Sequence, residues 1–165
     1  MRGIFKVLFI FVISLTLLAS VPARAVDLAQ SFVVGGDVGF DIDPDLFASA
    51  LIAEYHVTSN VAFGPYFTTG FDNDNFLFAT SGIAKYKANL SETGKLKPYG
   101  MVGVGFLVRN EKHSGDWDRD TEFYFPVGGG FEYWFMDNLA WGANMLFNVS
   151  DDIYWSMFVG LRTKF

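Results

Sequence analysis

Apolar and polar residues alternate along most of the chain after residue 30. One phase carries aromatic and branched side chains, and the other carries glycines and charges. Because successive side chains of a strand point to opposite sides, this alternation predicts β-strands with a single apolar face. Eight stretches show the pattern: residues 31–42, 47–57, 61–71, 76–88, 98–109, 122–135, 139–149 and 153–165. Each has roughly the length of a strand that crosses a bilayer at a tilt.

Segments rich in turn-forming residues separate the eight stretches. They are residues 43–45, 58–60, 72–75, 90–95, 110–120, 136–138 and 150–152. The segment 110–120 is the longest, and we expect it to form the one long loop. Pro65 and Pro126 fall inside alternating stretches, and because proline removes a ladder donor we expect them at bulges or strand ends.

Charged residues of the predicted strands all lie on the phase opposite to the apolar one. They are Asp37, Asp41, Glu54, Lys85, Lys87, Arg109, Glu122, Glu132, Arg162 and Lys164. The apolar phase is free of charge and aromatic toward its ends. Hydrocarbon outside a barrel and headgroups at both rims favour this pattern.

Strands can span a membrane only as a closed sheet, because each unpaired backbone group in lipid costs several kcal/mol. The sequence therefore predicts an all-β fold, an eight-stranded antiparallel up-and-down transmembrane β-barrel with both termini on one side. A soluble sandwich or a lipocalin-like cup is the alternative, since these also have one apolar face. After residue 25 no segment has the roughly 18 uninterrupted apolar residues of a membrane helix.

The first 25 residues predict a secretory signal peptide. Arg2 and Lys6 precede an apolar run over residues 7–18, and Ala23 and Ala25 favour cleavage after Ala25. Residues 26–165 then form one domain, the barrel. Loss of the signal's three basic residues reduces Lys and Arg from 12 to 9, against 18 Asp and Glu. This acidic balance argues against nucleic acid as a partner.

Three stretches carry a resemblance to a known family. They are "KPYGMVGVGF" (97–106), "GGGFEYWFMDNLAWGANMLF" (128–147) and the terminal "VGLRTKF" (159–165). The chain resembles the small OmpA/OmpX-like outer-membrane β-barrels. The resemblance implies a Gram-negative cell outer membrane, reached through the periplasm, and insertion by the barrel assembly machinery. It also implies a C-terminal assembly signal, which Gly160 and Phe165 match; Thr163 stands where a more hydrophobic residue is common.

Inward charges from alternate strands suggest a candidate site inside the barrel. Glu54, Lys85, Glu132 and Arg162 each lie a few residues from the same end of their strands, so we expect a ring of ion pairs at one depth. A barrel of this size is just wide enough to be filled by side chains, which favours a polar plug. The alternative is a gate that opens a narrow pore when ion-pair partners exchange.

We find no convincing catalytic residues. His113 and Ser114 are adjacent in sequence and rarely form a nucleophile–base pair in that arrangement, and His56 faces the lumen beside Glu54 without an evident serine. We therefore do not expect an enzyme, and a lipid A-modifying activity is a minor alternative. Asp116, Asp118 and Asp120 begin like a calcium loop but lack the glycine and distal glutamate of an EF-hand.

The sequence therefore predicts a monomeric outer-membrane barrel with a structural or surface-interaction role and an ion-paired lumen. A narrow channel for ions or small solutes is the alternative. We expect no cofactor and no metal site. The expected partners are outer-membrane lipid and lipopolysaccharide, and the barrel assembly machinery during insertion. The acidic outer segments could recruit divalent cations that bridge to lipopolysaccharide phosphates.

Overall fold

The chain folds into a closed barrel of eight antiparallel strands, which confirms the predicted fold class. The computed structural model describes residues 27–42, 45–72, 75–88, 94–113 and 116–165, so the predicted signal peptide lies outside the described residues. The strands are β1 (Phe32–Ile42), β2 (Leu46–His56), β3 (Val61–Phe71), β4 (Asn75–Lys87), β5 (Leu96–His113), β6 (Asp116–Trp134), β7 (Leu139–Val149) and β8 (Ile153–Lys164). In the described part of the chain no helix is long and apolar enough to cross a membrane.

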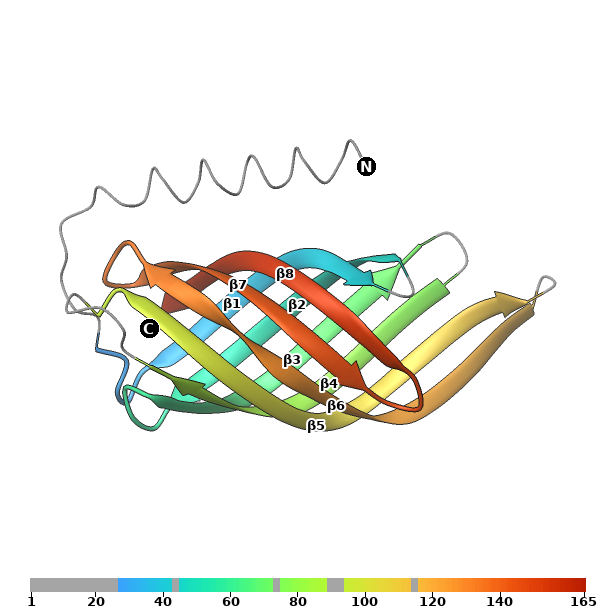
Figure 1. Ribbon diagram of the computed structural model, residues 1–165, viewed down its shortest axis with the longest axis horizontal. Coiled ribbons are helices and arrows are strands. Elements are labelled where there is room, and N and C mark those ends of the chain that lie inside the picture. Colours follow the sequence, from blue (N-terminus) through green and yellow to red (C-terminus); the bar gives the residue numbers. More distant parts are fainter. Residues whose placement is uncertain (1–26, 43–44, 73–74, 89–93, 114–115) are drawn as a thin grey trace.

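Every strand pairs with its neighbours in sequence, and β1 closes the barrel against β8 (Figure 1). The closing register runs from Val33 opposite Lys164 to Ile42 opposite Trp155. Both described chain ends lie at one end of the barrel, called here the terminal end. The opposite end is called the hairpin end, because β5 and β6 extend there beyond the other strands. Outer-membrane barrels keep their short turns in the periplasm, so we expect the terminal end to face that compartment.

The long loop expected at residues 110–120 is instead mostly strand, so that prediction was wrong. β5 continues to His113 and β6 begins at Asp116, with Glu111 opposite Asp118. Ser114 and Gly115, between the two strands, lie outside the described residues. The sequence did not indicate these strands, because residues 110–120 are polar or charged at nearly every position and lack an alternating apolar phase.

Pro65 and Pro126 lie in the middle of β3 and β6, so the expectation of bulges or strand ends was also wrong. Between β2 and β3 the pairing is interrupted at Pro65 and resumes in the same register. Between β5 and β6 the same occurs at Pro126. A bulge would insert a residue and shift the register. Each proline therefore removes local ladder pairing without displacing its strand, since it lacks only the N–H group.

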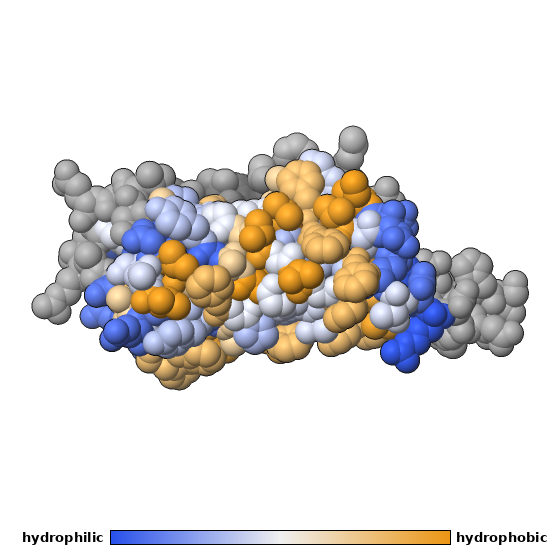
Figure 2. All heavy atoms as spheres, turned by 90° about the horizontal axis from the view of Figure 1, so that it is seen from below, coloured by the Kyte–Doolittle hydropathy of each residue, from blue (hydrophilic) through white to orange (hydrophobic). Residues whose placement is uncertain are grey.

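The apolar phase of the strands faces outward. Large exposed side chains on it include Phe32, Val38, Phe40, Leu51, Tyr55, Phe63, Tyr86, Val104, Phe106, Phe123, Trp155, Met157 and Leu161. Figure 2 shows hydrophobic side chains over the middle of one face and hydrophilic residues at both ends. Aromatic rings contact one another across strands, as Phe147 and Trp155 do with centroids 4.3 Å apart. A water-soluble protein would bury these side chains, so their exposure requires a lipid environment.

The inward side chains fill the barrel in apolar and polar groups. Leu28, Val33, Trp134 and Ala140 form an apolar group at the terminal end. Leu46, Leu77, Leu107, Tyr124 and Tyr154 belong to a second group toward the hairpin end. A third group, which includes Tyr66, Tyr99, Met101 and Phe158, lies between them. The charged residues described next are placed among these apolar groups.

Candidate functional site

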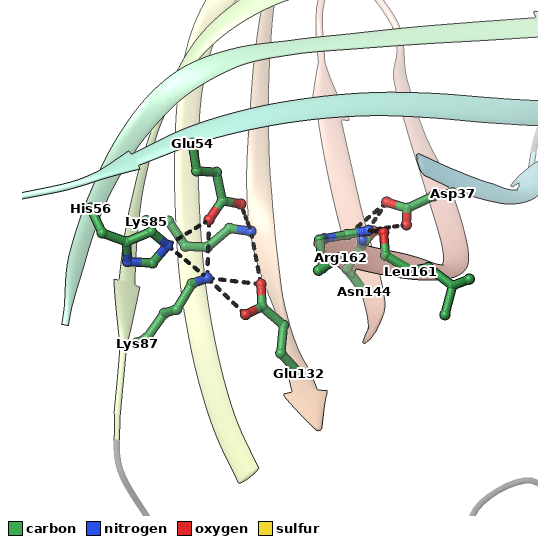
Figure 3. Close-up of polar contacts among 9 residues, drawn as sticks. All are labelled: Asp37, Glu54, His56, Lys85, Lys87, Glu132, Asn144, Leu161 and Arg162. Carbon is green, nitrogen blue, oxygen red and sulfur yellow. Dashed lines mark hydrogen bonds and ion pairs between the residues drawn. The ribbon is translucent and has the colours of Figure 1, made fainter. Parts of the chain in front are cut away.

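Five polar side chains meet inside the barrel near the terminal end (Figure 3). Lys85 contacts Glu54 and lies 3.5 Å from a carboxylate oxygen of Glu132. Lys87 Nζ lies 3.0 Å from Glu54 Oε2 and 2.7 Å from Glu132 Oε2. His56 Nε2 lies 3.3 Å from Glu54 Oε2 and 3.3 Å from Lys87 Nζ. We call these five residues the lysine–glutamate cluster.

The strand pattern explains why these residues meet. Glu54 and His56 are two apart on β2, and Lys85 and Lys87 are two apart on β4, so each pair shares the inward face. Glu132 reaches the same depth from β6. Burial is complete or nearly so, with each of the five residues at most 2% exposed.

The cluster balances its charge, with two lysines against two carboxylates. Burying a single ion costs several kcal/mol, and mutual attraction offsets this cost only where geometry is good and further hydrogen bonds are made. Each lysine here lies between both glutamates, so every full charge has two opposite neighbours. Tyr99 adds its ring face, 4.1 Å from Lys85 Nζ. Such an arrangement ties β2, β4 and β6 together across the lumen.

Arg162 does not join this cluster, although the sequence grouped it with Glu54, Lys85 and Glu132. Its guanidinium forms a bidentate pair with Asp37, in which Nη2 donates to Oδ2 at 2.8 Å. Asn144 Nδ2 approaches the same carboxylate at 3.5 Å. The arginine lies against Gly35, where any side chain would overlap it. The lumen therefore holds two separate charge groups at this end.

Sequence reasoning left Lys87, His56 and Asp37 out of the expected ring, although it placed all three on the inward phase. The period of two was the available signal for Lys87 and His56, since each lies two residues from a member of the ring. Asp37 had no such signal. Its pairing with Arg162 follows from the β1–β8 register, in which Asp37 lies opposite Gly160, two residues from the arginine.

The hairpin half of the lumen contains a chain of hydrogen bonds. Tyr124 donates its hydroxyl to Asn148 Oδ1 at 2.7 Å, and Asn148 Nδ2 donates to Ser156 Oγ at 2.5 Å. Ser156 in turn donates to Asp41. All four side chains are buried. Asp41 forms no ion pair with any described residue, so neutral donors stabilise its carboxylate.

A further ion pair lies at the mouth of the hairpin end. Arg109 of β5 donates to Asp152 Oδ2 at 3.0 Å, across the opening to the loop between β7 and β8. The backbone N–H of Asp151 donates to Glu122 Oε2 at 3.2 Å. Asp152 is well exposed, so this pair contacts water, unlike the groups deeper in the lumen.

The two residues of the expected assembly signal lie on the closing seam. Phe165 N–H donates to Phe32 O at 2.8 Å, and Phe165 is 75% exposed on the outer surface. Gly160 lies opposite Asp37, and a side chain there would overlap the carboxylate that pairs with Arg162.

Of the candidate catalytic residues, only His56 is described in full, and its ring belongs to the lysine–glutamate cluster. The side chain of His113 and all of Ser114 lie outside the described residues. Among residues that are described, no group of three or more His, Cys, Asp or Glu side chains is arranged to hold a metal ion.

A closed antiparallel sheet with an apolar outer face and a polar, charge-paired interior defines the class of outer-membrane β-barrels. Comparison with known proteins agrees with this class. The chain belongs to the family of the outer membrane protein beta-barrel domain, whose model matches residues 13–159. Membership implies a location in the outer membrane.

Solved structures with the same fold include three bacterial proteins. The N-terminal β-barrel domain of Pseudomonas aeruginosa OprF is 19% identical, with a TM-score of 0.69 over 83% of this chain and 98% of that one. Neisserial surface protein A is 16% identical, with a TM-score of 0.67 over 83% and 98%. The attachment invasion locus protein Ail of Yersinia pestis is 16% identical, with a TM-score of 0.61 over 82% and 97%. No curated protein sequence matches the chain.

Proposed function

We propose that this chain is a monomeric outer-membrane barrel with a structural or surface-interaction role, whose lumen is a closed polar plug. The observation that supports a closed lumen most strongly is the lysine–glutamate cluster, which spans from β2 to β4 and β6 and is buried and neutral. Bulky side chains above and below it, such as Tyr66, Tyr124 and Trp134, are also fully buried. Eight strands leave an interior that side chains can fill completely.

Recording from planar bilayers tests the closed lumen. Purified protein should give no unit currents, and neither should Arg162→Ala, because that arginine lies outside the cluster that spans the lumen. A general porin in the same bilayers controls for detection. The wild-type protein and Arg162→Ala must each first show the shift in gel mobility on heating that marks a folded barrel. Reproducible current steps from the wild-type protein would overturn the plug.

One observation favours the second candidate, a narrow pore. Lys85 and Lys87 each contact both Glu54 and Glu132, so the pairs can exchange partners without moving the strands. In this case Arg162→Ala and the wild type would both conduct, and Lys85→Met would change the size or frequency of the current steps. Equal currents in Lys85→Met and the wild type would exclude a gate at this cluster.

The β5–β6 hairpin supports a surface-interaction role, because it extends beyond the other strands. One solved structure of Ail is a complex with the heparin analogue sucrose octasulfate. At the hairpin end of this chain, the described and exposed charged residues are mostly acidic. They include five aspartates and one arginine: Asp45, Asp72, Asp120, Asp151, Asp152 and Arg119. This balance disfavours a polyanion as the partner. We propose that divalent cations link the acidic rim to lipopolysaccharide phosphates, with the phosphates supplying ligands that the described carboxylates alone do not.

A calcium titration tests the acidic rim. In vesicles that contain lipopolysaccharide, the tryptophan fluorescence of the folded barrel should change with calcium. A variant with Asp151→Asn and Asp152→Asn should bind more weakly, since it removes two carboxylates at the mouth. Asp137→Asn, at the terminal end, is the matched control and should bind as the wild type does. Equal titrations for all three proteins would exclude cation binding at this rim.

The proposed role includes no catalysis. Lipid A extracted from cells with and without the protein should give the same mass spectrum. A loss or transfer of one acyl chain that depends on the protein would reverse this assignment.

A further inference from the structure

A short segment ahead of β1 packs into the lumen at the terminal end. Residues 27–31 turn back under the barrel, and Leu28 inserts its side chain among Val33, Trp134 and Ala140. Leu28 is 0% exposed, as are all three of these neighbours. Val33 belongs to β1, Trp134 to β6 and Ala140 to β7, so the inserted leucine packs against the side of the barrel that β6, β7, β8 and β1 form.

The same segment is bonded directly to the lysine–glutamate cluster. Gln30 N–H donates to His56 O at 2.8 Å, and His56 N–H donates to Ser31 O at 2.9 Å. The ring of His56 meanwhile contacts Glu54 and Lys87. The segment therefore lies against the backbone of a residue whose side chain belongs to the buried charges.

Asp27 anchors the outer end of the segment. Its carboxylate accepts hydrogen bonds from Ala29 N–H at 2.9 Å and from Ser59 Oγ at 2.7 Å, and its carbonyl accepts one from Lys164 Nζ at 2.7 Å. The bonds from Ala29 and then Ser59 hold the pKa of Asp27 below its ordinary value of 3.8. This anchor is complete above that value and weakens only as pH falls below it, so it is present at neutral pH.

The turn itself is held in an unfavourable conformation. Gln30 has φ of 56°, in the left-handed region that non-glycine residues seldom adopt. Ser31 stabilises the turn by donating its hydroxyl to Leu28 O at 2.5 Å. A strained turn persists only where surrounding contacts fix it, so loss of the anchors would favour release of the whole segment.

We propose that residues 27–31 form a lid that shields the lysine–glutamate cluster from water at the terminal end. When seated, the lid places Leu28 across the opening and keeps the lysines inaccessible. When released, it turns about Ser31 and hydrates the cluster while the eight strands remain paired. With cleavage after Ala25, as the sequence predicts, the lid would follow a free chain end and could leave without unfolding a strand.

Thiol labelling measures the position of the lid, because the chain has no cysteine. Leu28→Cys in the folded barrel should react with a water-soluble maleimide at least about tenfold more slowly than Asp137→Cys in an exposed turn, since burial of an apolar side chain stabilises the seated state by more than a factor of ten. Adding Ser59→Ala should raise the Leu28→Cys rate about fivefold, the value of one net hydrogen bond. Ser150→Ala removes a similar bond at the hairpin end and is the matched control. This change should leave the labelling rate of Leu28→Cys unchanged.

Equal labelling of Leu28→Cys and Asp137→Cys in a barrel that is folded by gel mobility would overturn the lid. If Leu28→Cys does not fold, amide exchange in the wild-type protein decides the question, since the N–H groups of Gln30 and His56 must be protected in a seated lid. Rapid exchange at both would overturn it as well.

Amine labelling tests the shielding. Leu28→Asp should increase acylation of Lys87 by a water-soluble reagent about tenfold or more, because an ionised side chain does not remain in the apolar group. Unchanged acylation would show that the lid does not control access. If Leu28→Asp increases acylation of Lys87 but gives no current in bilayers, the lid is supported and the closed lumen also stands. The lid proposal and the closed-lumen proposal can therefore be overturned independently.

Discussion

The two halves of the lumen hold carboxylates by different means. Near the terminal end, Glu54 and Glu132 are neutralised by Lys85 and Lys87, and Asp37 by Arg162. In the hairpin half, Asp41 is stabilised by Ser156 at the end of a chain of neutral donors. Both halves are buried, so the difference lies in the partners and not in access to water.

This difference has consequences for stability. In the terminal half, removing one charge leaves an opposite charge unpaired in a dry interior, which is strongly destabilising. In the hairpin half, removing the charge leaves only neutral groups behind. The same type of substitution should therefore have unequal effects in the two halves.

The largest effect is expected from Glu132→Ala, which leaves two lysines with one glutamate. The free energy of unfolding should fall by about 3–5 kcal/mol, measured by urea unfolding in lipid vesicles with gel mobility as the readout. A double variant, Glu132→Met with Lys87→Met, restores neutrality and should recover much of the loss. If the double variant were less stable than the single one, charge balance would not be the cause.

Asp37→Asn and Asp41→Asn make the same chemical change in the two halves. We expect Asp37→Asn to lower the free energy of unfolding by about 3 kcal/mol, because Arg162 loses its counter-ion. Asp41→Asn keeps an oxygen that accepts from Ser156 and should change stability by less than about 1 kcal/mol. Equal losses in the same urea assay would remove the distinction between the halves.

Ser156→Ala tests how far neutral donors stabilise Asp41. The buried carboxylate loses its donor, at a cost of about 1–3 kcal/mol. Asp41→Asn in the Ser156→Ala background should reduce that cost, since a neutral amide needs the donor less. Additive losses in this double-mutant cycle would contradict the proposed coupling.

The smallest effect is expected from Arg109→Ala at the hairpin mouth. Its pair with Asp152 is partly exposed, and pairs of this kind contribute less than about 1 kcal/mol. High salt should remove most of the difference from the wild type, as screening predicts. A loss as large as that of Glu132→Ala would show that the mouth is as dry as the lumen.

The strands and the direction of their side chains were predictable from the sequence, because a period of two fixes both together. Phe40 and Trp155 face outward and Asp37 and Lys85 inward, as their phases indicated. The depth of each inward charge along the barrel axis was harder to predict from the sequence. The stagger between neighbouring strands decides which inward charges meet, and for this reason Arg162 was assigned to the wrong group. The strands around residues 110–120 were hidden because no apolar face distinguishes them.

The two mid-strand prolines, Pro65 and Pro126, interrupt the backbone pairing of the barrel wall at two places. Pairing is interrupted between β2 and β3 and between β5 and β6, whereas the other six seams are continuous. The two interruptions differ in effect. The seam between β5 and β6 still pairs from Leu96 opposite Tyr133 to His113 opposite Asp116 and is the longest in the wall, whereas the seam between β2 and β3 retains the fewest pairs of all. A force that widens the barrel would therefore open the seam between β2 and β3 before the others.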